Sequence, residues 1–243
     1  MDLGLRDSVC LVTGSTGGIG LATVELLRAE GAKVVSVGRS GGDVRADLSQ
    51  PGEPERVVET TIERHGRLDV LVNNVGSSVI CKLEDLTDDH WQASFEINLM
   101  SAVRATRAAL TDMRKRGSGP IVNVSSTAAK RPSTGMPDYS VMKAALLSFS
   151  RLVADLYAKD GIRCNAVTPG PTATAAWLAE GGLADQQGAR AEVLARVAAG
   201  RPLGRLAEPG EIAAVITFLC SPRSSYVTGA AWSADGGTVP IIV

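Results

Sequence analysis

The sequence contains few of the residues on which metal and thiol chemistry depend. Among its 243 residues are only two histidines, His65 and His90, and four cysteines, which are Cys10, Cys81, Cys164 and Cys220. No two cysteines are close enough to form a CxxC pair, and two histidines cannot build a His-rich metal centre, so we expect no metal. Isolated cysteines in apolar stretches are typical of buried free thiols, which favours a reducing, cytoplasmic location.

The sequence also lacks an excess of charge of one sign and any long apolar run. Lys and Arg total 25 against 26 for Asp and Glu, which gives a formal net charge of −1. This balance removes the general argument for a nucleic-acid partner. No apolar run approaches the ~18 residues of a membrane span, and the first residues do not form a signal peptide. We therefore expect neither a nucleic-acid nor a membrane partner.

Apolar strands and amphipathic helices alternate along the chain. The expected strands are Ser8–Thr13, Lys33–Val37, a short Asp43–Asp47, Leu68–Asn73, Ile121–Ser125, Ile162–Thr168 and Gly229–Ala234. The expected helices are the stretch after Gly20, Pro54–His65, Thr87–Arg116, Pro137–Lys159 and Glu208–Leu219. Continuous apolar strands are typical of a parallel sheet covered on both faces. The sequence predicts one domain over 1–243, an α/β doubly wound parallel sheet (a Rossmann fold) of about seven strands.

A glycine-rich turn links the first expected strand to the first helix. Gly14 permits a tight turn, Gly18 lets the backbone approach a pyrophosphate, and Gly20 allows close helix packing. The N–H groups and partial positive charge of the helix N-terminus suit a phosphate. The spacing is GxxxGxG and not the GxGxxG of the usual dinucleotide fingerprint, so a simple turn is the alternative.

Six features, the glycine turn among them, together carry a family resemblance. Thr13-Gly-Ser-Thr-Gly-Gly-Ile-Gly20 is similar to the TGxxxGIG motif of the short-chain dehydrogenase/reductase family, in its compact single-domain branch. Asn73-Asn-Val-Gly76 resembles its NNAG motif, with Val75 in place of Ala. Tyr139-Ser-Val-Met-Lys143 matches its YxxxK motif, Pro169-Gly-Pro-Thr-Ala-Thr174 its PGxxxT motif, and Asn98 its helix asparagine. Ser126 precedes Tyr139 by 13 residues, as in the family. The resemblance covers the whole chain.

Tyr139 and Lys143 form the chemical centre of this pattern. Four residues apart on a helix, they share a face, and an ammonium lowers the pKa of a neighbouring phenol. A pair at this spacing is also common on helix surfaces. The resemblance implies that Tyr139 exchanges the proton of the substrate, that Ser126 bonds the same oxygen, and that Lys143 also binds the nicotinamide ribose. It implies that Asn98 holds a water in a proton relay; stabilising a helix kink is the alternative. Ser125 is the alternative to Ser126.

The resemblance also implies a set of cofactor contacts. They are Gly14, Ser15, Thr16, Gly18, Ile19, Gly20, Arg39, Ser40, Asp47, Leu48, Asn74, Val75, Gly76, Tyr139, Lys143, Pro169, Gly170, Thr172 and Thr174. Thr174 would bond the nicotinamide carboxamide and Asp47 the adenine. Alternatively, Thr174 caps a following helix and Asp47 caps a turn at Ser49.

The end of the second strand bears on the choice of nicotinamide. An NAD site has an acidic residue about 20 positions beyond the glycines, whereas an Arg suits a 2′-phosphate. Arg39 and Ser40 stand here, which favours NADP(H) and leaves NAD(H) as the alternative. Only seven residues separate Arg39 from Asp47, too few for a helix, so we expect a glycine loop there.

We therefore expect an oxidoreductase that transfers a hydride between NADP(H) and a secondary alcohol/ketone pair, with 3-oxoacyl thioesters among the possible substrates. The alternatives are a catalytically silent nucleotide-binding regulator and an NAD-dependent dehydrogenase of a sugar, steroid or polyol. Residues 173–200 are expected to cover the substrate as a mobile or helical segment. Lys130 and Arg131 suit either an anionic substrate or a solvated turn. By family resemblance the helices around 95–116 and 137–159 pair subunits, in a homotetramer or else a dimer, and the apolar end Val239–Val243 favours packing at an interface.

Overall fold

The computed structural model describes residues 2–240 and contains a parallel sheet of seven strands within them. The strands are β1 (Val9–Val12), β2 (Lys33–Gly38), β3 (Val44–Arg45), β4 (Val70–Asn73), β5 (Gly119–Val124), β6 (Ile162–Pro169) and β7 (Ala231–Ala234). Their order is β3-β2-β1-β4-β5-β6-β7, and every neighbouring pair is parallel. The chain therefore winds outward from β1 in one direction and from β4 in the other, which confirms the doubly wound fold.

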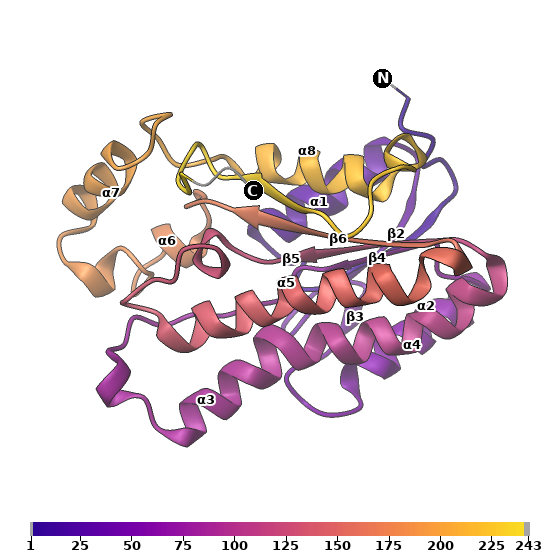
Figure 1. Ribbon diagram of the computed structural model, residues 1–243, viewed down its shortest axis with the longest axis horizontal. Helices are drawn as coiled ribbons and strands as arrows, with labels where there is room; N and C mark the ends of the chain where they lie inside the picture. Colours follow the sequence, from indigo (N-terminus) through magenta and orange to yellow (C-terminus); the bar gives the residue numbers. More distant parts are fainter. Residues whose placement is uncertain (1, 241–243) are drawn as a thin grey trace.

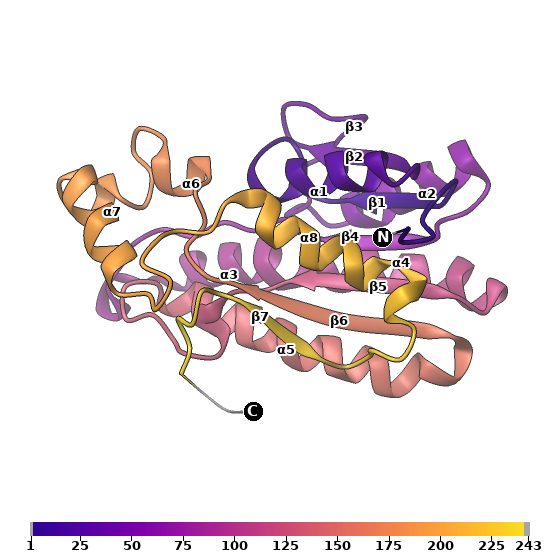
Figure 2. The ribbon, with the colours of Figure 1, turned by 90° about the horizontal axis from the view of Figure 1, so that it is seen from above.

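Helices cover both faces of the sheet (Figure 1). α1 (Gly18–Ala29) and α8 (Pro209–Cys220) lie on one face. α2 (Glu53–His65), α4 (Ser101–Arg116) and α5 (Pro137–Tyr157) lie on the other. The view from above separates the strands, with β3 and β7 at opposite edges (Figure 2). The short helices α6 (Ala175–Leu178) and α7 (Arg190–Ala199) stand beyond one end of the sheet in both views.

Two apolar cores follow from this layering. Along β1 the side chains alternate, because successive residues of a strand point to opposite faces. Cys10 and Val12 enter the core under α1 and α8, whereas Leu11 enters the core under α2, α4 and α5. All three are fully buried. Continuous apolar strands are thus the local consequence of a sheet with two dry faces.

The single helix expected over 87–116 is divided in three. α3 (Asp88–Phe95) is followed by a π-helical segment, Glu96–Met100, and then by α4. The start is as expected, since the Thr87 hydroxyl accepts from the His90 N–H and His90 closes a capping box. Asn98 lies inside the π segment and is buried. Such π segments are frequent at functional sites because they redirect the side chains of one turn.

The loop after β2 is short and tightly held. The Asp43 carboxylate accepts from the Ser36 N–H at 2.9 Å and the Ser36 hydroxyl at 2.7 Å, and it pairs with Arg28 at 3.1 Å. Burial acts to raise the pKa of Asp43, but the Ser36 hydrogen bonds and the charges of Arg28 and Arg64 hold it below its ordinary value. The expected short strand is shorter still, Val44–Arg45, because Asp43 belongs to this loop. A glycine loop thus stands in place of a helix, as predicted.

The last three residues of the apolar end predicted to pack at an interface, 241–243, lie outside the described residues.

Candidate active site

The glycine turn lies where β1 and β4 end side by side. Gly14 has φ +60°, and a Cβ placed there would stand 2.8 Å from the Cα of Val75. A Cβ at Gly20 would stand 2.4 Å from the Gly14 carbonyl oxygen. Real Cβ contacts are not that short, so both positions require glycine. The backbone of the turn is therefore pressed directly against the loop that follows β4.

The N-terminus of α1 is open toward a cleft. Its N-cap residue is Gly17, which has no side chain to accept from the first N–H groups of the helix, and the first turn contains no acidic residue. Nothing lies within 4 Å of the place where a Cβ of Gly17 would stand. Free N–H groups and a positive helix end with open space before them fit the pyrophosphate of a dinucleotide.

The cleft has a volume of about 1170 Å³ and runs from this turn across the ends of β5 and β6 to the α6 segment. Of the residues expected at the site, twelve line it: Gly18, Ile19, Gly20, Asn74, Gly76, Ser126, Tyr139, Lys143, Pro169, Gly170, Thr172 and Thr174. A ligand-binding cleft at the carboxyl ends of parallel strands, beside a topological switch point, is the usual place for a site in this class of sheet.

Tyr139 and Lys143 occupy successive turns of α5 and both face the cleft. The Lys143 Nζ lies 5.7 Å from the centroid of the Tyr139 ring and donates to the Val124 carbonyl at 3.0 Å. The pair therefore does not lie on the exposed surface of the helix, because Lys143 is buried and its ammonium reaches the end of β5.

Burial shifts the pKa of both groups. It lowers the pKa of Lys143 to about 8 and raises the pKa of Tyr139, with a hydrogen-bonding contribution from Ser126 acting against the latter shift. The prediction that Lys143 lowers the pKa of Tyr139 is therefore wrong for this structure, where burial raises that pKa. Tyr139 is thus held as the protonated phenol at neutral pH.

The two candidate serines at the end of β5 have different environments. The Ser125 hydroxyl donates to the Lys143 carbonyl at 2.8 Å and ties β5 to α5. The Ser126 hydroxyl accepts from the Ala128 N–H at 3.1 Å and retains its own proton for a further partner. The arrangement favours Ser126 as the residue that meets a substrate.

Asn98 spans the gap between the π segment and the loop after β4. Its amide donates to the Ser77 carbonyl at 2.9 Å and to the Ser94 hydroxyl at 3.2 Å, and it accepts from the Ser77 N–H at 3.0 Å. A Cβ at Gly76 would stand 3.0 Å from its Oδ1. The side chain thereby fixes the wall of the cleft next to Lys143, which fits the helix-kink interpretation.

Two threonines follow β6. Thr174 is the N-cap residue of α6 but makes no side-chain cap bond, and its methyl group faces Gly18 across the cleft. Thr172 is buried, and its hydroxyl donates to the Gly170 carbonyl. Thr174 therefore bridges the two sides of the cleft, whereas Thr172 stabilises the turn.

The remaining expected contacts divide into exposed and inward-facing groups. Thr16, Arg39 and Ser40 are exposed and do not line the cleft. The Asp47 Oδ1 accepts from the Ser49 N–H and hydroxyl, which is the turn-capping alternative, and the hydrogen bonds to Ser49 hold its pKa below the ordinary value with a smaller effect from Arg39.

The side chains of Ser15 and Leu48 point into the protein, and only their backbone remains for a ligand. Ser15 donates to the Val12 carbonyl and accepts from Val37, while Leu48 belongs to the core. Val75 packs against that core, and its N–H donates to the Thr13 hydroxyl.

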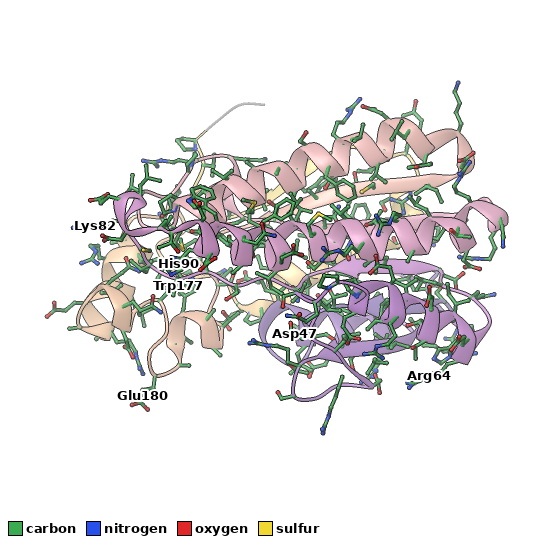
Figure 3. All side chains as sticks on the ribbon, turned by 90° about the horizontal axis from the view of Figure 1, so that it is seen from below. Asp47, Arg64, Lys82, His90, Trp177 and Glu180 are labelled. Carbon is green, nitrogen blue, oxygen red and sulfur yellow. The ribbon has the colours of Figure 1, made fainter. Side chains whose placement is uncertain are left out.

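The structure adds residues to the cleft that the sequence did not single out. The 173–200 segment supplies Ala176, Trp177, Leu183 and Gln186, as its expected place implies, but Arg201 and Val239 also line the wall. Trp177 lies on the inner side of the α6 segment, and Glu180 at its outer edge (Figure 3). Arg131 lines the cleft, whereas Lys130 does not; its Nζ donates to the Ala231 carbonyl and the Ser233 hydroxyl of β7.

Residues 2–240 contain no group of three or more His, Cys, Asp or Glu side chains placed to hold a metal ion. Within the same range, no helix has the length and apolar character needed to cross a membrane.

Comparison with known proteins finds many sequences and solved structures that are similar to this chain. A family model described as enoyl-(acyl carrier protein) reductase matches residues 14–239. The uncharacterized oxidoreductase YvrD of Bacillus subtilis is 34% identical over 98% of this chain and 99% of its own length. The 3-oxoacyl-(acyl-carrier-protein) reductase of Vibrio cholerae is 33% identical over 97% and 98%. The structure of L-sorbose reductase from Gluconobacter frateurii, complexed with NADPH and L-sorbose, superposes with a TM-score of 0.91 at 35% identity and full coverage of both chains.

The buried ammonium of Lys143 makes a testable prediction about stability. Its pKa falls from 10.5 to about 8 on folding, so the unfolded chain binds more protons between these values. Below pH 8, keeping the buried Lys143 amine charged lowers the free energy of unfolding by roughly 3 kcal/mol. This loss of stability shrinks as the pH rises from 8 to 10.5. We expect Lys143→Met to raise the free energy of unfolding of the cofactor-free protein at pH 7 by about 1–3 kcal/mol, partly offset by the lost bond to Val124.

Urea denaturation at pH 7 and at pH 9.5 would measure this difference. Lys159→Met, which removes an exposed lysine, serves as the control and should change little at either pH. A Lys143→Met protein that is less stable than the wild type at pH 7 would contradict the prediction.

Proposed function

Because this chain belongs to the short-chain dehydrogenase/reductase family and is a nicotinamide-dependent oxidoreductase, we propose how its own residues serve the transfer of a hydride between NADP(H) and a secondary alcohol/ketone pair. The observation that carries the proposal is the convergence of Ser126, Tyr139 and buried Lys143 on one cleft with an open helix N-terminus. The bound nicotinamide supplies the hydride.

Tyr139 is the proposed proton donor to the carbonyl oxygen of the substrate. Its pKa is raised by burial, so the phenol carries its proton at neutral pH, which supports the reductive direction. Ser126 donates a hydrogen bond to the same oxygen and stabilises the charge that develops there. Lys143 lies 5.7 Å from the Tyr139 ring centroid, where its positive charge favours the phenolate left after proton transfer.

Asn98 is a positioning residue in this proposal. Its amide is engaged by Ser77 and Ser94, so it holds the wall beside Lys143 in place. A water relay at Asn98 stays a prediction from the family resemblance.

The cofactor is proposed to lie along the glycine turn. The close approach of Gly14 to Val75 and the open α1 N-terminus accommodate its pyrophosphate, and Thr174 reaches the turn from the other side. Gly76, Pro169 and Gly170 form the adjoining walls, and Arg39 and Ser40, both exposed after β2, are proposed to meet a 2′-phosphate.

The proposed substrate is a ketone covered by residues 173–200, which line the same cleft as Tyr139. Relatives named as 3-oxoacyl thioester reductases and a sugar reductase support a carbonyl substrate in general. We further propose a single domain over the chain and a cytoplasmic location, the latter supported by free cysteines at 10, 81, 164 and 220 and testable by cell fractionation.

A homotetramer is proposed from the outer face of α5. Val141, Leu152 and Leu156 are more than half exposed there, at spacings that place them on one side of the helix. Exposed aliphatic side chains on one face of a helix do not stabilise a single chain, whereas a contact between subunits would remove them from water.

The proton-transfer role is tested by Tyr139→Phe. We expect kcat for ketone reduction by NADPH to fall by roughly 10²- to 10⁴-fold because the acid is removed, while the Kd for NADPH changes little. Absorbance assays on a panel of ketones, with fluorescence titration of NADPH, give both quantities. Tyr157→Phe, on the same helix, is the control; turnover retained by Tyr139→Phe would refute the role.

The cofactor preference is tested by Arg39→Ser. An exposed Arg–phosphate contact contributes modestly, so we expect KM for NADPH to rise roughly 3- to 10-fold and KM for NADH to stay the same. Steady-state kinetics with both cofactors measure the ratio, with Arg45→Ser as the neighbouring control. If wild-type protein prefers NADH, or if both cofactors weaken equally, the NADP(H) proposal is wrong.

The oligomer is tested by light scattering coupled to size exclusion. Four chains of 25.2 kDa give about 101 kDa, and we expect Leu152→Glu with Leu156→Glu to lower this mass to that of a dimer or monomer. A wild-type mass of one chain would exclude the tetramer.

A further inference from the structure

Two arginines face the substrate end of the cleft without a carboxylate to balance them. Arg131 follows the turn after β5, and Arg201 follows α7, so they come from distant parts of the chain. Both line the cleft that contains Tyr139. Among residues 2–240, neither guanidinium has a carboxylate partner within ion-pair distance, although twelve other ion pairs are formed there.

Arg201 is held in an unfavourable position. Its Nε is buried and has no hydrogen-bond partner, and one Nη donates only to the carbonyl of the adjacent Gly200 at 3.1 Å. Burial lowers the pKa of Arg201, and the like charge of Arg131 lowers it further. A buried donor without an acceptor costs stability, so such an arrangement calls for a ligand that completes it.

Asp235 is the acidic residue whose charge acts on Arg201, and both of its carboxylate oxygens already accept hydrogen bonds. Asp235 accepts from the Gly237 N–H at 3.0 Å through Oδ1 and from the Val239 N–H at 3.1 Å through Oδ2. It lines a second, smaller cavity of about 420 Å³ that Arg201 also borders, and it does not line the main cleft. The Asp235 charge is therefore directed away from the substrate.

We propose that Arg201, with Arg131, forms a subsite for an oxyanion on the substrate, so that this enzyme acts on ketones bearing a carboxylate or a phosphate group. The inference rests on the proposed function for the reacting end, where Tyr139 meets the carbonyl. A carboxylate or phosphate supplies acceptors for the unpaired N–H groups of the Arg201 guanidinium and relieves the repulsion between the two cations. An uncharged ketone would leave both cations without a partner.

Matched pairs of ketones test the substrate class. Levulinate is compared with its methyl ester, and dihydroxyacetone phosphate with dihydroxyacetone, so each pair differs mainly in the anion. We expect kcat/KM of the wild type to favour the anion of at least one pair by roughly 10- to 100-fold, and Arg201→Gln to bring that ratio close to one. The pair that shows the preference separates carboxylate from phosphate.

A binding arm keeps this test independent of turnover. Calorimetric titration with levulinate and with inorganic phosphate should show Kd values raised at least 10-fold by Arg201→Gln and unchanged by Arg196→Gln, which changes an exposed arginine of α7, the helix that precedes Arg201. If no ketone is reduced but Arg201-dependent anion binding is found, the proposed function fails and the subsite stands.

Stability separates a ligand site from a structural arginine. Because the buried Nε has no partner, Arg201→Gln should leave the melting temperature of the ligand-free protein unchanged or raise it. A marked fall in melting temperature, absence of any anion preference in the wild type, or a preference that survives both Arg201→Gln and Arg131→Gln would overturn the proposal.

Discussion

The site depends on one joint, where the end of β1 is fastened to the end of β4. The Thr13 hydroxyl accepts from the Asn74 N–H at 2.9 Å and the Val75 N–H at 3.2 Å. The Asn74 amide donates in return to the carbonyls of Thr13 and Gly14, at 3.0 and 2.8 Å. From these two strands the chain winds in opposite directions, so the joint fixes the floor of the cleft. Glycine at 14 and 20 is the condition for it, because a side chain at either position would separate the two backbones.

The sequence was sufficient for those features that are encoded locally. Each strand could be predicted because two dry faces require a continuous apolar run, and Leu11 between Cys10 and Val12 shows the two cores that result. The Thr87 cap and the glycine loop after Arg39 likewise follow from neighbouring residues. The π segment at Glu96–Met100 could not be predicted, because the apolar period of 87–116 continues through it and only the contact of Asn98 with Ser77 marks its place.

The sequence does not predict which way a side chain points or which distant segments come into contact. Ser15 and Leu48 lie in positions that match family motifs, yet their side chains face the interior: Ser15 bonds the backbone of Val12 and Val37, and Leu48 packs into the core. Arg201 carries no motif and lies 62 residues after Tyr139 in sequence. Its place in the same cleft results from how α7 packs beyond the sheet, which no local pattern of residues records.

The lining of the cleft carries an excess of positive charge that the chain as a whole does not have. The chain as a whole carries a net charge of −1, but the lining contains the cations Lys143, Arg131 and Arg201 against the single acid Glu180. Glu180 lies at the outer edge of its segment (Figure 3). A cleft with low-dielectric walls concentrates the field of such an imbalance. Both the pyrophosphate of a nicotinamide cofactor and an anionic substrate would be drawn by it, and the folded state bears the cost of burying the Lys143 ammonium and the Arg201 Nε.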